Sequence, residues 1–302
     1  MRARATGPAR AGRGAGRPGG AAGPRSAAAG GAKGARGPGG ASELPPAAVE
    51  AAAARLRAAR RERVPCAPLT DLLPVTAEAG YAVQDVNTER ALRAGRRLVG
   101  RKIGLTSAAV RAQLGVHEPD YGMLFADRAH ADGEPVPAAS LLQPRVEAEI
   151  AFVLGRDLAR EGLTEADVAR AIDHAVAAIE VVDSAVRDWD ISILDTVADN
   201  ASAGRFVLGA EPRPLRAFDA RLCDMVLERR GEVVATGAGA ACLGSPLTAA
   251  LWLAKKMVAV GRPLRAGDVV LSGALGPLAP AAAGDVFEAR IGGLGAVRAV
   301  FG

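Results

Sequence analysis

The chain has 302 residues, of which 49% are hydrophobic, 24% charged and 3% aromatic, and its formal net charge is +5. These values are typical of a globular protein and exclude a collagen-like or wholly disordered chain. No stretch reaches the roughly 18 consecutive apolar residues of a membrane-spanning helix, which predicts a soluble protein. The three cysteines are odd in number and lack CxxC spacing, which argues against a disulfide framework or a thiolate metal site and favours a reducing cytoplasm.

Residues 1–45 form a distinct Arg/Gly/Ala/Pro-rich segment. The first 43 residues hold eight basic residues and one acid, so the rest of the chain carries a net charge of −2. Because this segment has no apolar periodicity, we expect a disordered tail. It can be interpreted as a basic arm for nucleic acid, a solvated low-complexity tail or a translated leader upstream of the true start. The lack of aromatic residues for stacking on bases disfavours the first interpretation.

We expect residues 46–302 to form a single domain. The sequence pattern predicts, in chain order, helices over 49–63 and 77–95, a strand over 98–106, a short helix over 107–115 and a turn at the start of 118–125. It then predicts a strand over 146–155, a helix from Thr164 to about Ala175, a strand over 177–184 and a helix over 191–200. A hairpin over 223–237, a helix from Ser245 to Gly261 and short strands from Gly267 onward complete the pattern. Without regular βαβα alternation, this order predicts an α+β fold with a mixed, strongly curved sheet.

Two glutamates stand out in the apolar segment PRVEAEIAFVL. Glu147 and Glu149 are two residues apart on a predicted strand, so their carboxylates share one face. Like charges this close raise each other's pKa unless a cation lies between them, although two solvated glutamates on an exposed face would give the same pattern. Glu180 lies in a second apolar strand, AAIEVVDS. Three carboxylates on buried strands would form an all-oxygen site that suits Mg²⁺ or Mn²⁺ better than Zn²⁺.

Lys102 is the second chemical feature of the sequence. The chain has four lysines against 34 arginines, so the lysine in the apolar segment GRKIGLT is interpreted as needed for its compact, titratable ammonium. An ordinary solvated strand lysine is the alternative. The histidines His117, His130 and His174 lack the spacing of metal ligands, and His174 falls in the predicted helix as an ordinary histidine.

Six ordered motifs carry a resemblance to a known family: GRKIGLTS, EPDYGMLF, PRVEAEIAFVL, AIEVVDS, DNASAGRFVLG and LSGALGP. Over residues 48–302 the chain resembles the 2-oxopent-4-enoate (2-hydroxypenta-2,4-dienoate) hydratases of the fumarylacetoacetate hydrolase superfamily. The resemblance implies a mixed β-roll or barrel of the superfamily's C-terminal-domain type with peripheral helices. It also implies a lyase that adds water to the dienoate, giving 4-hydroxy-2-oxopentanoate, in the meta-cleavage degradation of aromatic compounds.

The same resemblance implies a site and its contents. A divalent metal, Mg²⁺ or Mn²⁺, is expected between three glutamates, with two groups that transfer protons or orient water and three substrate contacts. The matching positions are Glu147, Glu149 and Glu180 for the metal, Lys102 and Asp120 for proton transfer, and Ser202, Gly273 and Gly276 for the substrate.

Other functions remain open at this point. The sister 2-oxo-3-hexenedioate (4-oxalocrotonate) decarboxylases resemble the hydratases in fold and metal site, and LSGALGP favours the hydratase. A nucleic-acid-binding or scaffold protein that uses the basic tail is disfavoured by the net charge of −2 on the rest of the chain. We expect a small 2-hydroxydienoate or 2-oxo acid as substrate and a homo-oligomer, with no membrane and no nucleic acid as partners. Association with a related decarboxylase is a further hypothesis.

Overall fold

The computed structural model describes residues 44–302. The predicted tail therefore lies outside the described residues, apart from its last two positions. The helices of the described part are α1 (Pro46–Glu62), α2 (Ala77–Arg93), α3 (Ala108–Gln113), α4 (Glu165–Ala171), α5 (Ile193–Ala198) and α6 (Pro246–Ala259). Within residues 44–302, no helix combines the length and the apolar character needed to cross a membrane.

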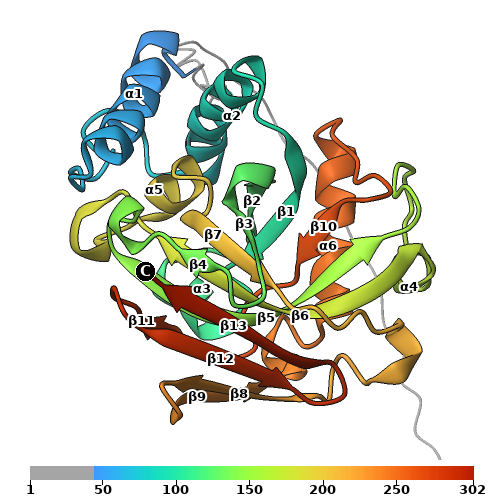
Figure 1. Cartoon of the computed structure of the whole chain (residues 1–302). Coiled ribbons are helices and arrows are strands. Elements are labelled where there is room, and N and C mark those ends of the chain that lie inside the picture. The colour runs from blue at the N-terminus through green and yellow to red at the C-terminus, as the bar shows by residue number, and fades with distance from the viewer. Residues whose placement is uncertain (1–43) are drawn as a thin grey trace, which may run out of the picture. The chain divides into compact units, whose positions relative to one another are not determined.

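A curled, mixed sheet forms the centre of the fold (Figure 1). Its strands follow the order β2-β1-β10-β5-β6-β7-β3, and β11 pairs with β5. The β1–β10 and β3–β7 pairs are parallel and the others antiparallel, which confirms the predicted mixed, curved sheet. The strands are β1 (Leu98–Gly104), β2 (Asp120–Phe125), β3 (Ala129–Ala131), β5 (Pro144–Leu154), β6 (Ile172–Asp183), β7 (Ala203–Leu208), β10 (Val269–Leu271) and β11 (Ala279–Pro280).

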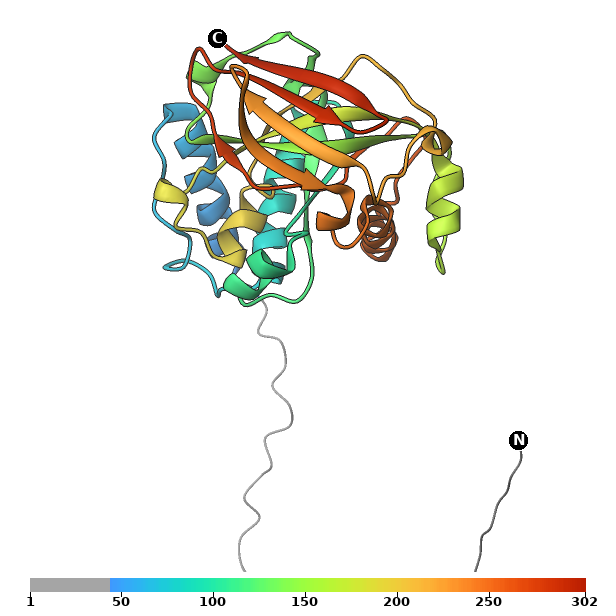
Figure 2. The ribbon, with the colours of Figure 1, turned by 90° about the horizontal axis from the view of Figure 1, so that it is seen from below.

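A second sheet packs across the first (Figure 2). Its order is β4-β13-β12-β8-β9, with strands β4 (Pro135–Val136), β8 (Asp224–Arg229), β9 (Glu232–Ala238), β12 (Val286–Ile291) and β13 (Gly295–Phe301). The predicted hairpin is the β8–β9 pair, and it turns at Arg230 (φ 53°) and Gly231 (φ 85°). Two consecutive positive φ values are what a two-residue hairpin loop of the primed type requires.

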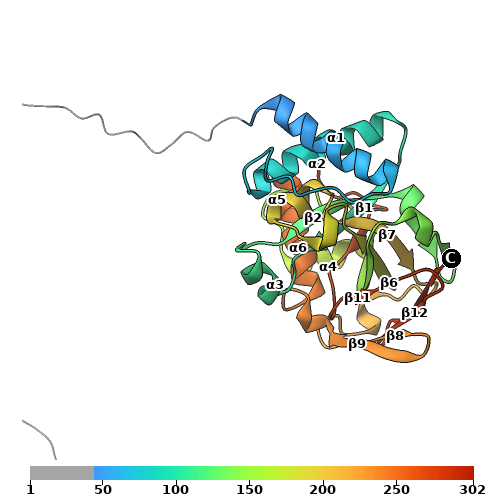
Figure 3. The same ribbon diagram turned by 90° about the vertical axis from the view of Figure 1, so that its left-hand side faces the viewer.

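Side-chain alternation on β5 and β6 gives the two faces of the first sheet different partners. One face carries Ile150, Ile179 and other apolar side chains, which pack in one buried cluster with Phe287 and Val297 of the second sheet. The three glutamates alternate with these residues and so point from the opposite face. Helices α1, α2 and α5 share a separate apolar cluster, and α1 and α2 lie across the first sheet from β8 and β9 (Figures 1 and 3).

One predicted boundary is wrong. The helix expected from Thr164 to about Ala175 ends at Ala171, and β6 begins at the next residue. His174 therefore lies on a strand, opposite Val153, rather than in a helix. Thr164 does close a capping box with Asp167, as predicted. The helix passes directly into the strand with no glycine or proline between them, so the sequence contains no local signal for the change.

Arg60 ties α1 to the ends of β6 and α5. Its guanidinium lies 2.7 Å from Asp183 Oδ2 and 2.9 Å from Asp199 Oδ1, and both carboxylates are buried. The backbone N–H groups of Leu142 and Gln143 also donate to Asp183 Oδ1. Arg60 thus joins three segments that are distant in the sequence.

Replacing Arg60 with Met should destabilise the fold by about 3 kcal/mol, because two buried carboxylates lose the only guanidinium that pairs with them among residues 44–302. The adjacent Arg61→Met is a matched control, since Arg61 pairs with Glu62 on the surface and such pairs contribute at most about 1 kcal/mol. Urea unfolding of both variants measures the difference. Equal stability of the two variants would show that Arg60 is not a structural bridge.

Candidate active site

The three predicted metal-binding glutamates come together on one face of the first sheet. In the β5–β6 register Glu147 lies directly opposite Glu180, and Glu149 follows two residues along β5. One carboxylate oxygen of each residue lies within 4.8 Å of the others. Glu149 and Glu180 are buried, whereas Glu147 is partly exposed.

This grouping is electrostatically unfavourable without a compensating charge. Desolvation, followed by the charge of Glu180, raises the pKa of Glu147 to about 7. Desolvation and the charges of Glu180 and Glu147 raise the pKa of Glu149 well above its usual value. Gly273 N–H donates to Glu149 Oε2 at 2.8 Å, but Glu149 Oε1 and Glu180 Oε2 are buried and accept no hydrogen bond within residues 44–302. The cluster therefore offers oxygen ligands that the surrounding protein leaves unused.

Lys102 projects from β1 into the same cluster. Its Nζ lies 3.0 Å from Glu180 Oε1, as an ion pair, and donates to the Ala201 carbonyl at 2.8 Å. Burial would lower the pKa of Lys102, but the nearby carboxylates, Glu180 foremost, raise it above its usual value. The side chain is therefore a buried ammonium and not the solvated strand lysine of the alternative interpretation.

Asp120 faces the same space from β2. Its residue pairs with Gly104 across the β1–β2 ladder, and a Cβ added at Gly104 would overlap Asp120 Oδ1 and come within 3.6 Å of Lys102 Nζ. Both carboxylate oxygens of Asp120 are buried and accept no hydrogen bond from the described residues. Desolvation raises the pKa of Asp120 to about 6, against the opposing effect of the Lys102 charge.

The three predicted substrate-contact residues lie in different surroundings. Ser202 is buried beside the carbonyl that receives Lys102, and its hydroxyl has no hydrogen-bond partner within residues 44–302. Gly273, with φ 104°, supports Glu149 through its N–H. Gly276 packs instead against the second sheet, where an added Cβ would lie 2.9 Å from Thr236 O. Its contact with substrate stays a prediction.

Sequence reasoning missed the role of Asn200 in shaping this site. Asn200, Ala201 and Ser202 form a turn with three consecutive positive φ values, 59°, 52° and 55°, without a glycine. The Asn200 side chain holds the turn to β2, because its Oδ1 accepts from Met123 N at 2.7 Å and its Nδ2 donates to Met123 O at 2.9 Å. The turn aims the Ala201 carbonyl at Lys102. The tolerance of asparagine for left-handed backbone was the signal available in DNASAG.

Two variants of Asn200 distinguish the effect of its side-chain hydrogen bonds, which position the turn, from the cost of its left-handed backbone. Asn200→Ala loses both side-chain hydrogen bonds and keeps a costly left-handed conformation, so it should destabilise the fold by about 3 kcal/mol. Asn200→Gly loses the same hydrogen bonds but relieves the strain, and should be about 1 kcal/mol more stable than the alanine variant. Turnover should fall about tenfold in both variants, because a well-placed catalytic geometry is lost in both. If turnover instead follows stability, Asn200 has only a structural role.

Comparisons with known proteins agree with this arrangement. The family model described as fumarylacetoacetate (FAA) hydrolase C-terminal matches residues 96–301. The chain is 61% identical over 251 residues to the TodF product hydratase of Pseudomonas putida F1, covering 83% of this chain and 94% of that protein. It is 58% identical over 250 residues to the 2-keto-4-pentenoate hydratase of Burkholderia vietnamiensis G4, covering 82% and 95%.

A solved structure of a related enzyme has the same fold. The 4-oxalocrotonate decarboxylase from Pseudomonas putida G7, complexed with magnesium and adipate, superposes with a TM-score of 0.82 at 36% identity, covering 86% of this chain and 99% of that chain. The predicted fold and the predicted family are thereby confirmed. The chain belongs to the 2-keto-4-pentenoate hydratase family of the fumarylacetoacetate hydrolase superfamily.

Proposed function

We propose that the protein adds water to 2-hydroxypenta-2,4-dienoate, giving 4-hydroxy-2-oxopentanoate, with a divalent cation held by Glu147, Glu149 and Glu180. The observation that carries the proposal is the three-glutamate cluster, in which Glu149 and Glu180 are buried, with Lys102 and Asp120 beside it. The identity of 53–58% to several 2-keto-4-pentenoate hydratases supports the substrate class.

The donor set fits a hard divalent cation. All three candidate ligands are carboxylates, which suits Mg²⁺ or Mn²⁺. If all are ionised, the three glutamates and Asp120 carry four negative charges against the one positive charge of Lys102, so two added positive charges would offset most of the remainder. The magnesium in the related decarboxylase structure supports the same class of metal. When bound, such a cation supplies stabilisation of negative charge at the C2 oxygen of a 2-hydroxy acid.

The side chains around the cluster can perform the proton transfers. The 2-hydroxyl of the dienoate must lose a proton and C5 must gain one, which gives a 2-oxo-3-enoate; water then supplies its hydroxyl to C4 and a proton to C3. Asp120, whose pKa is raised to about 6, can hold or release a proton near neutral pH. Lys102 would orient the anionic substrate as a fixed ammonium, and the Ser202 hydroxyl, which has no partner among residues 44–302, would bind a substrate oxygen or the water.

Decarboxylation of 2-oxo-3-hexenedioate is the second candidate, because the decarboxylase structure shares the fold. An ultraviolet assay of dienoate loss with product identification distinguishes the two. We expect 4-hydroxy-2-oxopentanoate from the five-carbon dienoate and no CO₂ from 2-oxo-3-hexenedioate. Release of CO₂ as the dominant reaction would overturn the hydratase assignment.

The wider setting of the reaction is also part of the proposal. We propose Mn²⁺ as an alternative to Mg²⁺, a homo-oligomeric state, and a place in aromatic catabolism with a related decarboxylase as partner. Light scattering after size-exclusion chromatography, with and without the decarboxylase, tests the assembly. A single monomeric peak under both conditions would contradict it.

A further inference from the structure

A second cavity lies apart from the carboxylate cluster, between α1, α2, β2 and β7. Its volume is about 350 Å³, and none of the three glutamates, Lys102 or Asp120 lines it. Its walls carry six arginines: Arg57, Arg60, Arg90, Arg96, Arg128 and Arg205. The lining includes one acid, Asp199, which Arg60 already binds.

Part of this positive charge is already neutralised. Arg57 pairs with Glu50 and Arg96 pairs with Asp127, both through contacts of 2.7–2.9 Å. Arg128 comes no closer than 3.8 Å to the same aspartate.

Arg90 and Arg205 have no carboxylate within 4 Å among residues 44–302. Arg205 Nη2 donates to Ser140 Oγ at 2.9 Å, while its Nε and Nη1 are buried and have no partner in the described part of the chain. Burying guanidinium nitrogens without acceptors is costly, so the Arg205 side chain would gain free energy by turning these donors toward an anion in the cavity.

The rest of the lining mixes neutral polar and apolar side chains. Gln84, Asn87, Thr88 and Asn200 are polar, whereas Leu56, Ala91 and Phe125 are apolar, and Arg96 stacks over the Phe125 ring at 4.1 Å. The volume lies at the small end of the range for ligand pockets. A compact molecule with one anionic end and an apolar body matches both the arginines and the apolar side chains, whereas inorganic phosphate would leave the apolar side chains uncovered.

We propose that this cavity is a second binding site, which takes a small organic carboxylate. Arg205 and Arg90 donate to the carboxylate, and Phe125 and Ala91 contact the apolar body. None of the candidate metal ligands lines this site, although Asn200, whose turn positions the Ala201 carbonyl beside Lys102, does.

Calorimetric titration of the full chain with benzoate tests the site, because benzoate combines a carboxylate with a flat apolar body. We expect one binding event per chain that survives chelation of metals, weakens as NaCl is raised and is absent with benzyl alcohol. Inorganic phosphate should bind more weakly than benzoate.

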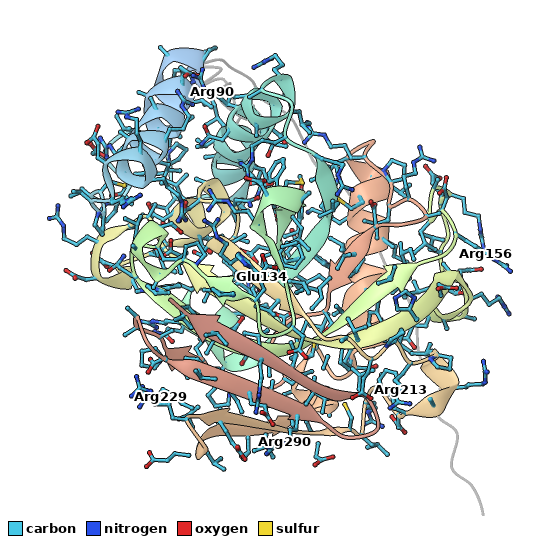
Figure 4. All side chains as sticks on the ribbon, in the orientation of Figure 1. Arg90, Glu134, Arg156, Arg213, Arg229 and Arg290 are labelled. Atoms are coloured by element: carbon cyan, nitrogen blue, oxygen red, sulfur yellow. The ribbon has the colours of Figure 1, made fainter. Side chains whose placement is uncertain are left out.

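Variants locate the binding event. Arg205→Met should weaken benzoate binding about tenfold by removing a charge-assisted hydrogen-bond donor, and Arg205→Lys should restore only part of it because the planar fork is lost. Arg90→Met should also weaken binding, whereas Arg156→Met is the matched control. Arg156 is likewise exposed without an ion pair, and it lies far from Arg90, near α4 (Figure 4).

Three results would overturn the proposal: no benzoate binding up to about 10 mM, equal binding by the Arg90, Arg205 and Arg156 variants, or loss of binding in Glu149→Gln with retention in Arg205→Met. The last result would place benzoate at the glutamates. Thermal unfolding of each variant confirms that it is folded. Because no turnover is measured, failure of the hydratase proposal would leave this result intact.

Discussion

Treatment with a chelator should abolish turnover, and Mg²⁺ or Mn²⁺ should restore it. The same metals should raise the free energy of unfolding, by about 2.7 kcal/mol when the metal is at 100 times its dissociation constant. The physical reason is that Glu147, Glu149 and Glu180 repel one another in a site with few internal donors. A bound cation replaces that repulsion with attraction.

The Glu149→Gln variant tests whether the charge of one proposed ligand is needed for metal binding. Glutamine can still accept the Gly273 N–H, but one of the three negative charges is gone. The metal-free variant should therefore be at least as stable as the metal-free parent, while the stabilisation by Mg²⁺ and the turnover should both be largely lost. Glu161→Gln changes an exposed glutamate that has no ion pair in the described part of the chain; it is the matched control and should behave as the parent. Full activity in excess chelator would remove the metal from the reaction.

Lys102→Arg should lower turnover about 100-fold or more, although the charge is preserved. The Lys102 ammonium is enclosed: its Cδ would lie 3.2 Å from a Cβ at Gly122, and Nζ is held between Glu180 and the Ala201 carbonyl. A planar guanidinium is larger and directs its donors in a fixed fork, so it cannot occupy this position in the same way.

Metal affinity shows whether the lower turnover of Lys102→Arg comes from weaker metal binding or from the changed side chain itself. Because Lys102→Arg keeps one positive charge beside Glu180, Mg²⁺ binding should change little, as measured by calorimetry. Lys255→Arg, on the exposed face of α6, is the matched control and should be silent. Near-parental turnover of Lys102→Arg would exclude Lys102 from the mechanism.

The carboxylate cluster was accessible to sequence reasoning because strand alternation is local. Glu147 and Glu149 share a face by their spacing alone, and an acidic residue in the apolar run around Glu180 signals a buried site. Glu147 lies opposite Glu180 because of the register between β5 and β6, and this register could not be predicted from the sequence. The motif resemblance supplied Asp120 and Ser202.

Other features depend on contacts between distant segments and so escaped prediction. Arg60 meets Asp183 across 123 residues of sequence, and Asn200 meets Met123 across 77. No pattern around either residue identifies its partner. The same holds for the arginine-lined cavity, since a chain with 34 arginines gives no sign of which ones converge.

The register between β5 and β6 also limits how this protein can change length during evolution. Pairing between β5 and β6 runs without interruption from Pro144 to Val153 and becomes irregular at Val153/Leu154, while the separate β6–β7 pairing is irregular at Val181/Val182. Inserting or deleting one residue inside that span would reverse the faces of the residues on one side of the change, so that apolar side chains there would point toward the cluster and any glutamate there toward the second sheet. Sequence drift in these strands is therefore restricted to substitutions, while length variation is confined to the loops and the bulged ends.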